Sequence, residues 1–348
     1  MKSRNRIIIY NLETDKNSLV LSSAIYWLAA FSNDFDYVQV YSIHVGDYEL
    51  SRNVSVTEIG GGNLLKKVRG FTRLVVSVVK AIPYRKRTVV FHHMSSRTAG
   101  TIGMFYFLLR IPQGLWYAHS HADPFLKASL KWINYFFTPS SKSFPLESKK
   151  IIYTGHGIPT DRFSKFQSSP RSGVVSIGRI ARIKNIQDGV VAIAESNLAD
   201  KTLHLYGSAA RGDEYPRELT KLAESKNVRI QFHGPINYEI LPEELLKYSI
   251  IFSGTPKSTD KALLEGAASG CFPLTNNGDA EKLTGMMGVW NDLQVDPKSS
   301  LSTKLSIVSN LLPQEALQYR KRISRATCAS SDVKNTVNAI GNVLRSKN

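Results

Sequence analysis

The chain has 348 residues, a length that suits two domains rather than a single core. With 42% hydrophobic residues it has the composition of a soluble globular protein, and its longest apolar runs, such as 102–111, are about half as long as a membrane span requires. The N-terminus shows no pattern typical of a secretory signal. The two cysteines, Cys271 and Cys328, lack the neighbours that structural zinc needs, which favours a reducing compartment.

The formal net charge of +17 is unevenly distributed along the chain. Residues 1–170 contain 22 Lys and Arg against 10 Asp and Glu, a net charge of +12, and the remainder contains 23 against 18, a net charge of +5. We therefore expect the first half to face something acidic, such as anionic lipid headgroups, nucleic acid or a phosphorylated acceptor. Charge that serves only solubility is the alternative. No helix-turn-helix, RNA-binding or zinc-finger pattern is present, so nucleic acid is not expected as a partner.

Short β-branched runs alternate with helical segments along the whole chain. In the first half, strands are predicted at 6–12, 37–43, 54–59, 88–94 and 114–120, and helical segments at 18–32, 64–82, 98–111 and 124–137. In the second half, strands are predicted at 173–180, 201–207, 228–234 and 250–254, and helical segments at 188–197, 215–225, 241–249 and from about 259. This alternation predicts an α/β protein with parallel sheets and crossover helices.

Two such series predict two Rossmann-like domains, an N-terminal one over 1–160 and a C-terminal one over 161–332. The boundary is expected in 157–173, which is rich in Ser, Pro and Gly. A helix at about 333–348 is a candidate for packing back on the first domain.

Segment 64–82 has helical periodicity and a strong separation of residue types. One face collects the apolar residues Leu64, Val68, Phe71, Val75, Val78 and Ile82, and the opposite face collects mainly Lys66, Arg69, Arg73 and Lys80. No acidic residue occurs from 64 to 87. The segment is either a helix at a membrane surface or an ordinary helix that covers a sheet. The two interpretations agree if the apolar face packs on the sheet and the basic face meets headgroups or an acceptor.

A strand that ends at Gly178 is followed by Arg179 and Lys184, five residues apart, and then by a helix. A glycine at a strand end lets a bound group approach the backbone. Cations at the carboxyl edge of a parallel sheet suit a diphosphate, and Arg182 adds to this charge.

The stretch TPKSTDKALLEGAASG at 255–270 reads as a loop followed by a helix. Ser258 or Thr259 is expected as the N-cap, with Asp260 in the first turn, so the helix N-terminus can hold a phosphate. Glu265 then lies about two turns in, where its carboxylate suits ribose hydroxyls. A structural or exposed helix glutamate is the alternative.

Taken together, these residues resemble the retaining glycosyltransferases of family 4. The motifs are GRIARIKN from Gly178, HLYGSA at 204–209, QFHGPINYEILPEELLKYS at 231–249 and LLEGAASG at 263–270. The resemblance covers about 160–290 well and the first half only loosely. It implies GT-B architecture, with two Rossmann-like domains facing an interdomain cleft.

The resemblance also implies roles for individual residues. Arg179 and Lys184 would bind the donor diphosphate beside Gly178 and stabilise the leaving group. Glu265 would hold the ribose, and backbone near Pro235 and Ile236 would meet the base. The first glutamate of the family motif falls on Lys257, so either Asp260 replaces it or Lys257 pairs with an acidic sugar. Asp260 acting simply as an acid at the helix N-terminus is a third interpretation.

In the first half, His119 follows a predicted strand and resembles a family histidine that approaches the donor sugar. His121 is the alternative, and His92 or His93 lie at another strand end. His156 is interpreted as structural. The loop at 11–17 lacks the double glycine that the family places near the donor phosphate.

The resemblance implies a retaining glycosyltransferase with a UDP- or GDP-linked sugar as donor and no other cofactor. No Asp-x-Asp metal motif stands out, so we expect a metal-independent reaction. The expected acceptor is a polysaccharide or lipid-linked glycan precursor in cell-surface biosynthesis, and the expected location is cytoplasmic, peripheral on the inner membrane face. A degenerate non-catalytic GT-B binder and a GT-B sugar-nucleotide epimerase are the alternatives.

Overall fold

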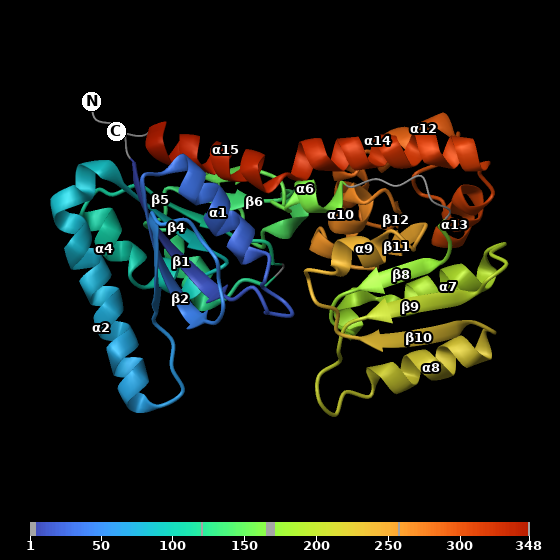
Figure 1. Cartoon of the computed structure of the whole chain (residues 1–348), viewed down its shortest axis with the longest axis horizontal. Coiled ribbons are helices and arrows are strands. Elements are labelled where there is room, and N and C mark those ends of the chain that lie inside the picture. Colours follow the sequence, from blue (N-terminus) through green and yellow to red (C-terminus); the bar gives the residue numbers. More distant parts are fainter. Residues whose placement is uncertain (1–4, 120, 165–170, 257, 347–348) are drawn as a thin grey trace. The chain divides into compact units, whose positions relative to one another are not determined.

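A computed structural model describes residues 5–119, 121–164, 171–256 and 258–346. The chain divides into two compact units (Figure 1). Unit 1 comprises Met1–Gly157 and Val333–Asn348, and unit 2 comprises Ile158–Asp332. Each unit has its own parallel sheet.

The sheet of unit 1 has seven strands in the order β3-β2-β1-β4-β5-β6-β7, and all neighbouring strands pair in parallel. The strands are β1 (Arg6–Thr14), β2 (Tyr37–Val45), β3 (Val54–Glu58), β4 (Thr88–His93), β5 (Gln113–Trp116), β6 (Tyr135–Thr138) and β7 (Ile151–Tyr153). The central strands β1 and β4 are apolar runs buried on both faces, which is the pattern that a sheet covered by helices on both sides requires.

Helices cover both faces of this sheet. They are α1 (Ala24–Asp34), α2 (Leu64–Ala81), α3 (Ser96–Gly100), α4 (Gly103–Leu108), α5 (Pro124–Ser129) and α15 (Val333–Ser346), with 3₁₀ turns η1 (Ile82–Arg87) and η2 (Ser141–Ser143). Helices α1 and α15 share one core cluster with β1 and β4, and α2 and α4 pack in another. The C-terminal helix α15 is tied to unit 1 by a hydrogen bond from Thr336 Oγ1 to the Thr154 carbonyl at 2.9 Å, and by an ion pair between Arg345 and Asp34 at 2.9 Å.

The orientation of α2 differs from one of the two interpretations of segment 64–82. A helix that covers the sheet with its large apolar residues was one of them, but Gly70, Ser77 and Ala81 face the core instead. A Cβ on Gly70 would lie 2.0 Å from the Ile59 carbonyl oxygen, and the Ser77 hydroxyl bonds to Tyr10 at 2.5 Å. Small residues let the helix approach closely, so most of the larger apolar residues point to solvent.

Two further predicted helices are shorter than expected. Segment 98–111 holds two helices, α3 and α4, rather than one. Segment 124–137 contains α5, which is capped by the Asp123 carboxylate, and then strand β6. The aromatic residues Phe136 and Phe137 of β6 are fully buried in the sheet, and this burial overrides the helical pattern.

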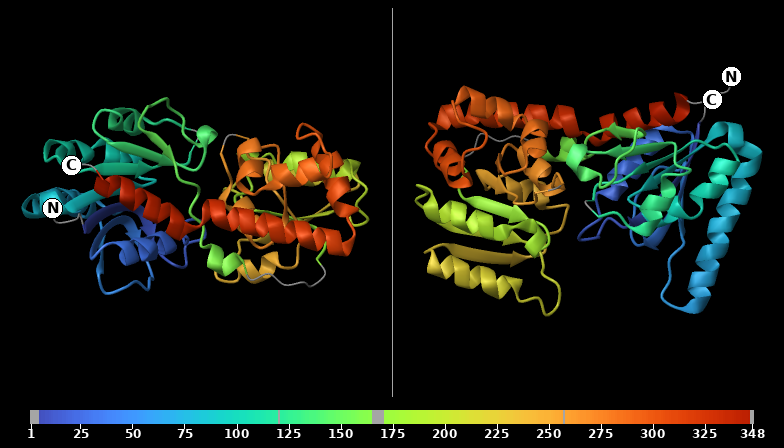
Figure 2. Two further views of the ribbon diagram at one scale, coloured as in Figure 1. Left: turned by 90° about the horizontal axis from the view of Figure 1, so that it is seen from above. Right: turned by 180° about the vertical axis from the view of Figure 1, so that it is seen from behind.

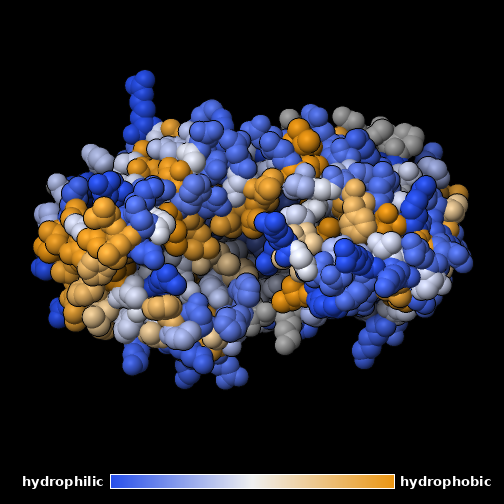
Figure 3. Space-filling model, turned by 90° about the horizontal axis from the view of Figure 1, so that it is seen from below, coloured by the Kyte–Doolittle hydropathy of each residue, from blue (hydrophilic) through white to orange (hydrophobic). Residues whose placement is uncertain are grey.

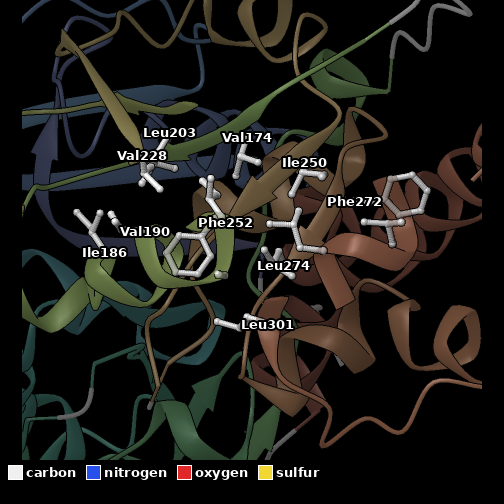
Figure 4. Close-up of a cluster of buried hydrophobic side chains, with 14 of the residues drawn as sticks. Val174, Ile186, Val190, Leu203, Val228, Ile250, Phe252, Phe272, Leu274 and Leu301 are labelled. Carbon is white, nitrogen blue, oxygen red and sulfur yellow. The ribbon is translucent and has the colours of Figure 1, made fainter. Parts of the chain in front are cut away.

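The sheet of unit 2 has five parallel strands in the order β10-β9-β8-β11-β12. The strands are β8 (Val174–Ile177), β9 (Thr202–Tyr206), β10 (Arg229–Gly234), β11 (Ile250–Phe252) and β12 (Phe272–Leu274). The helices are α6 (Thr160–Phe163), η3 (Arg182–Lys184), α7 (Ile186–Glu195), α8 (Tyr215–Ser225), α9 (Leu241–Leu245), α10 (Lys261–Ala268), α11 (Gly278–Leu283), α12 (Met286–Asp292), α13 (Leu301–Ser309) and α14 (Pro313–Ser331). Figure 4 shows the apolar core, where Val190, Phe252 and Leu301 meet from three elements.

Within the described part of the chain, no helix combines the length and apolar character needed to cross a membrane.

One ion pair lies inside the core of unit 2. Lys304 Nζ is 2.7 Å from Glu281 Oε1, and both side chains are almost completely buried. Trp290 Nε1 donates a further hydrogen bond to the same oxygen at 3.0 Å. We predict that Lys304→Ala lowers the free energy of unfolding by about 3–5 kcal/mol, because it leaves a buried carboxylate without its counter-charge. Urea unfolding followed by circular dichroism measures this change.

The exposed Lys321 supplies the control, and Lys321→Ala should stay within about 0.5 kcal/mol of the unmodified protein. Equal effects of the two substitutions would contradict the prediction.

Candidate functional site

At the carboxyl edge of the unit 2 sheet, strands β8 and β9 are each followed directly by a glycine, so main chain rather than side chains lines this edge. Strand β8 runs into Gly178 and β9 into Gly207, with φ angles of 131° and 148° that side chains rarely allow. The Gly178 amide donates to the Tyr206 carbonyl at 2.9 Å. A Cβ on Gly207 would lie 1.8 Å from the Gly178 oxygen, so only glycine fits there. A bound group can therefore come close to the backbone at these strand ends.

The strand order places a switch point between β8 and β11. Open α/β sheets bind ligands beyond the carboxyl ends of the strands at such a point. The loop that ends at Lys184 follows β8, and Gly254 follows β11. A Cβ on Gly254 would lie 2.8 Å from the Lys184 carbonyl oxygen, so the two loops touch. Lys184 therefore lies at the switch point.

Lys184 is held there by Asp260. Its Nζ atom is 2.6 Å from Asp260 Oδ2, and the two side chains are 22% and 11% exposed. The same carboxylate oxygen accepts a hydrogen bond from Ser253 Oγ at 3.0 Å. A Cβ on Gly178 would lie 3.6 Å from the Lys184 Nζ, so the ammonium group lies beside the glycine turn.

Several influences act on the pKa of Asp260. Burial alone would raise this pKa, but the charge of Lys184 and hydrogen bonds from Lys184, Ser253 and the Ala262 amide lower it below the usual Asp value. The carboxylate is therefore ionised at neutral pH, which keeps the ion pair intact.

The N-cap of α10 is Asp260, so the expectation of Ser258 or Thr259 was wrong. Helix α10 begins at Lys261, and Asp260 has extended backbone angles and accepts a hydrogen bond from the Ala262 amide at 3.4 Å. Thr259 is buried and Ser258 half-buried just before the cap. Asp260 is fixed as the N-cap by its contacts with Lys184 of the loop after β8 and Ser253 of the loop after β11. These contacts form only in the folded domain. Lys257 lies outside the described residues.

Glu265 lies just over one turn into α10 and is 1% exposed. Its Oε1 atom accepts a hydrogen bond from Tyr238 Oη at 2.5 Å and pairs with Lys261 Nζ at 3.4 Å. Burial raises the pKa of Glu265, while Lys261 and Tyr238 oppose that rise. The carboxylate is thus a buried acceptor in a cluster that joins α10 to the loop after β10.

The other predicted residues of this edge are more open to solvent. Arg179 is exposed directly after Gly178. Pro235 is exposed and Ile236 half-buried, directly after β10. Arg182 pairs with Glu218 of α8 instead of adding to the charge beside Lys184.

The histidines of unit 1 divide by burial. His119 is exposed after β5, and its Nδ1 accepts the backbone N–H of His121 at 3.0 Å, which places the proton of the neutral ring on Nε2. His92 is fully buried, and burial lowers its pKa to about 3. Burial and then the charge of His156 lower the pKa of His93 to about 3 as well. His119 thus keeps a ring edge open for a ligand, whereas His92 and His93 are packing residues.

His93 also has a tertiary partner. Its Nδ1 bonds to Asn11 Oδ1 at 3.0 Å, and its ring stacks on Trp27 with centroids 4.7 Å apart. The ring of His156 meets Trp116 edge-on at 5.3 Å.

Acidic groups in unit 1 have mostly structural partners. Asp34 and Asp36 have Asp-x-Asp spacing, but Asp34 pairs with Arg345 and Asp36 accepts a hydrogen bond from Asn5. Among the described residues, one group brings possible metal-ligand atoms within 4.8 Å of one another: Glu13, Asp15 and His44. Asp15 also accepts the Asn17 amide at 2.9 Å, the bond of an Asx turn.

Solved structures match the chain along almost its whole length, whereas no protein-family model and no curated protein matches it. HepE of Anabaena, solved with UDP and glucose, aligns with a TM-score of 0.70 and 14% identity over 98% of this chain and 100% of that chain. Sucrose-phosphate synthase of Thermosynechococcus elongatus aligns with a TM-score of 0.70 and 14% identity over 98% of both chains. A glycosyltransferase of Rickettsia africae aligns with a TM-score of 0.69 and 12% identity over 99% and 100%.

The chain has the GT-B fold of these glycosyltransferases. The prediction of two parallel-sheet, Rossmann-like domains is confirmed.

Sequence reasoning missed four residues of the candidate site in unit 2: Ser253, Tyr238, Lys261 and Asn277. Lys261 could have been found, because it stands four residues before Glu265 on a predicted helix. Asn277 donates to the Ser258 carbonyl at 3.1 Å, and Tyr238 is 27 residues from Glu265. Neither contact leaves a local signal in the sequence.

We predict that Asp260→Asn lowers the free energy of unfolding by about 1–3 kcal/mol at neutral pH, because Lys184 loses its counter-charge. The pKa of Asp260 is lower in the folded state than in the unfolded chain, so its contribution is present above the usual Asp pKa and disappears as the pH falls through the folded value. The difference between variant and parent should therefore be constant near neutrality and shrink only at acidic pH. Chemical unfolding over a pH series measures it.

Glu224→Gln, at an exposed position on α8, is the matched control and should change little at any pH. A difference between Asp260→Asn and parent that is largest in acid would refute the assignment.

Proposed function

We propose that the chain is a retaining glycosyltransferase of the family 4 type, which moves a sugar from a nucleotide-diphosphate sugar to an acceptor hydroxyl. The observation that carries this proposal is the Lys184–Asp260 ion pair beside Gly178 at the switch point of the unit 2 sheet. A cation held at that edge suits a diphosphate, and the N-terminus of α10 adds its amide groups.

Arg179 and Lys184 share the charge of the diphosphate in this proposal. Lys184 is positioned before any ligand arrives, whereas the exposed Arg179 is free to close on the phosphate. As the bond between the sugar C1 and the phosphate oxygen breaks, both cations stabilise the negative charge on the departing diphosphate. The acceptor oxygen bonds to C1 on the same face, and its proton passes to the departing phosphate oxygen. The two cations neutralise the charge, so the proposed step uses no metal.

Glu265 would accept hydrogen bonds from the ribose, and backbone at Pro235 and Ile236 would meet the base. The Nε2–H of His119 would donate to a hydroxyl of the donor sugar. The contacts of Asp260 favour positioning of Lys184 over direct contact with the sugar. Lys257 would then face the sugar in place of the family glutamate, and an acidic sugar would suit it.

The donor is proposed as a UDP- or GDP-linked sugar. UDP is the preferred candidate, because the similar structure of HepE was solved with UDP and glucose. The acceptor is proposed as a polysaccharide or lipid-linked glycan precursor at the cytoplasmic face of the membrane. The strongly basic first half and the two free cysteines support that location. A non-catalytic nucleotide-sugar binder is the second candidate, favoured by Lys257 in the glutamate position.

A panel of UDP- and GDP-sugars tested by thermal shift, followed by product analysis, tests the proposal. We predict that one nucleotide sugar raises the melting temperature and that the product keeps the anomeric configuration of the donor. Arg179→Ala should lower kcat/KM about 10²–10³-fold without unfolding the protein, because the side chain is exposed and stabilises developing charge. Lys221→Ala, exposed on α8, is the control.

Stabilisation without turnover would support the non-catalytic binder instead. No response to any nucleotide would reject both candidates.

Substitutions at the two positions of the glutamate motif, Lys257 and Glu265, are predicted to have different effects on donor turnover. Glu265→Ala should lose most donor turnover with any sugar, because the ribose is common to all donors. Lys257→Ala should keep turnover but change which sugar is preferred, because only the sugar would face it. Initial rates with the donor panel measure both. Unchanged turnover in Glu265→Ala would overturn its assignment.

A further inference from the structure

Helices α2 and α4 and the turn η1 carry many large apolar side chains that no described element of unit 1 covers. Leu64, Leu65 and Phe71 of α2 are 76%, 79% and 65% exposed, and Leu108 of α4 is 68% exposed. We call this the α2–α4 surface, and its exposed members are Leu64, Leu65, Val68, Phe71, Val75, Val76, Val79, Ile82, Tyr84, Met104, Phe105, Phe107 and Leu108. Figure 3 shows apolar residues gathered over the end of unit 1 that carries α2.

The two helices are neighbours because they share one core cluster. Leu74 and Val78 of α2 and Tyr106 of α4 pack on the same face of the sheet. The Ser77 and Tyr106 hydroxyls lie 3.2 Å apart. Only a narrow line of α2 is used in this packing, and its first turns project from the sheet in Figures 1 and 2. The apolar side chains of both helices therefore lie on one outer surface. Exposed apolar patches rimmed by polar residues mark interaction sites on protein surfaces.

The charge around the α2–α4 surface has one sign only. Residues 59–122 contain ten Lys and Arg and no Asp or Glu: Lys66, Lys67, Arg69, Arg73, Lys80, Arg85, Lys86, Arg87, Arg97 and Arg110. Most of these side chains are exposed next to the apolar ones. Its occupant must therefore offer apolar material and negative charge together.

We infer that the α2–α4 surface inserts into a bilayer that contains anionic lipid, with its apolar side chains among the acyl chains and its cations among the headgroups. An anionic bilayer supplies both of the required features. A second copy of the chain packed through the same surface supplies apolar material but no negative charge, because two-fold pairing would bring cations against cations. The projecting first turns of α2 suit insertion, since exposed apolar residues surround them on several sides.

This inference extends the membrane-face part of the proposed function and identifies the partner of unit 1. The sequence left a helix at a membrane surface and an ordinary sheet-covering helix as alternatives, and most of the large apolar residues of α2 do not pack on the sheet. An inserted apolar surface gives binding with two components. One depends on anionic lipid and is screened by salt, and the other resists salt.

Flotation of the full chain with vesicles tests the inference. We expect strong binding to vesicles of phosphatidylcholine and phosphatidylglycerol in equal parts, and at least about tenfold weaker binding to phosphatidylcholine alone. Part of the binding to anionic vesicles should survive high salt. The double variant Leu65→Ser and Phe71→Ser should lose this salt-resistant part. The variant Lys66→Glu, Lys67→Glu and Arg69→Glu should lose the preference for anionic lipid.

All of these positions are exposed, so the variants should keep the melting temperature of the parent. Arg73 is left unchanged because it donates a hydrogen bond to the Glu58 carbonyl. Leu312→Ser, at an exposed apolar position in unit 2, is the matched control and should bind vesicles like the parent.

Failure to bind either vesicle would overturn the inference, as would undiminished salt-resistant binding by the serine double variant. A lipid-free dimer that this double variant abolishes would also overturn it and would assign the surface to a second copy. The donor thermal shift is measured on the same samples. Vesicle binding without a donor response would leave this inference standing and reject the proposed function, and the reverse result would do the opposite.

Discussion

The ion pair between Lys184 and Asp260 organises the candidate site of unit 2. The two residues are 76 positions apart and belong to the loops after β8 and β11. Asp260 at the same time caps α10 and accepts a hydrogen bond from Ser253. One carboxylate therefore fixes the position of a cation, the start of a helix and the packing of two loops. Burial raises the pKa of this carboxylate, but the charge of Lys184 and the hydrogen bonds from Lys184, Ser253 and the Ala262 amide together outweigh that effect and keep it ionised.

Glu265 depends on this arrangement, because α10 carries it. The helix begins where Asp260 caps it, and the buried Glu265 carboxylate then meets Tyr238 and Lys261. A buried carboxylate with a raised pKa is costly to keep in an ordinary helix. The proposed function would use this buried carboxylate as an acceptor for the ribose.

In unit 1, helix α2 buries its small residues and exposes most of its large apolar ones. Helix α2 contacts its sheet through Gly70, Ser77 and Ala81, while its large apolar residues stay outside. Close approach through small residues gains hydrogen bonds between the Ser77 hydroxyl and the buried tyrosines Tyr10 of β1 and Tyr106 of α4. The larger residues are thereby left available for a partner, and the acid-free stretch 59–122 determines the charge that this partner must carry.

The sequence by itself determined the elements whose signals are local. Alternating β-branched and helical runs predicted two parallel sheets, and the strand ending at Gly178 followed by Arg179 and Lys184 could be read directly because these residues are neighbours. Only the tertiary structure decided the N-cap of α10, the partners of Glu265 and the outward face of α2. Each of these depends on residues far apart in the chain, such as Asp260 with Lys184, Glu265 with Tyr238 and Ser77 with Tyr10. Periodicity reports that a helix has two faces, but the close fit of small side chains against the sheet decides which face is buried.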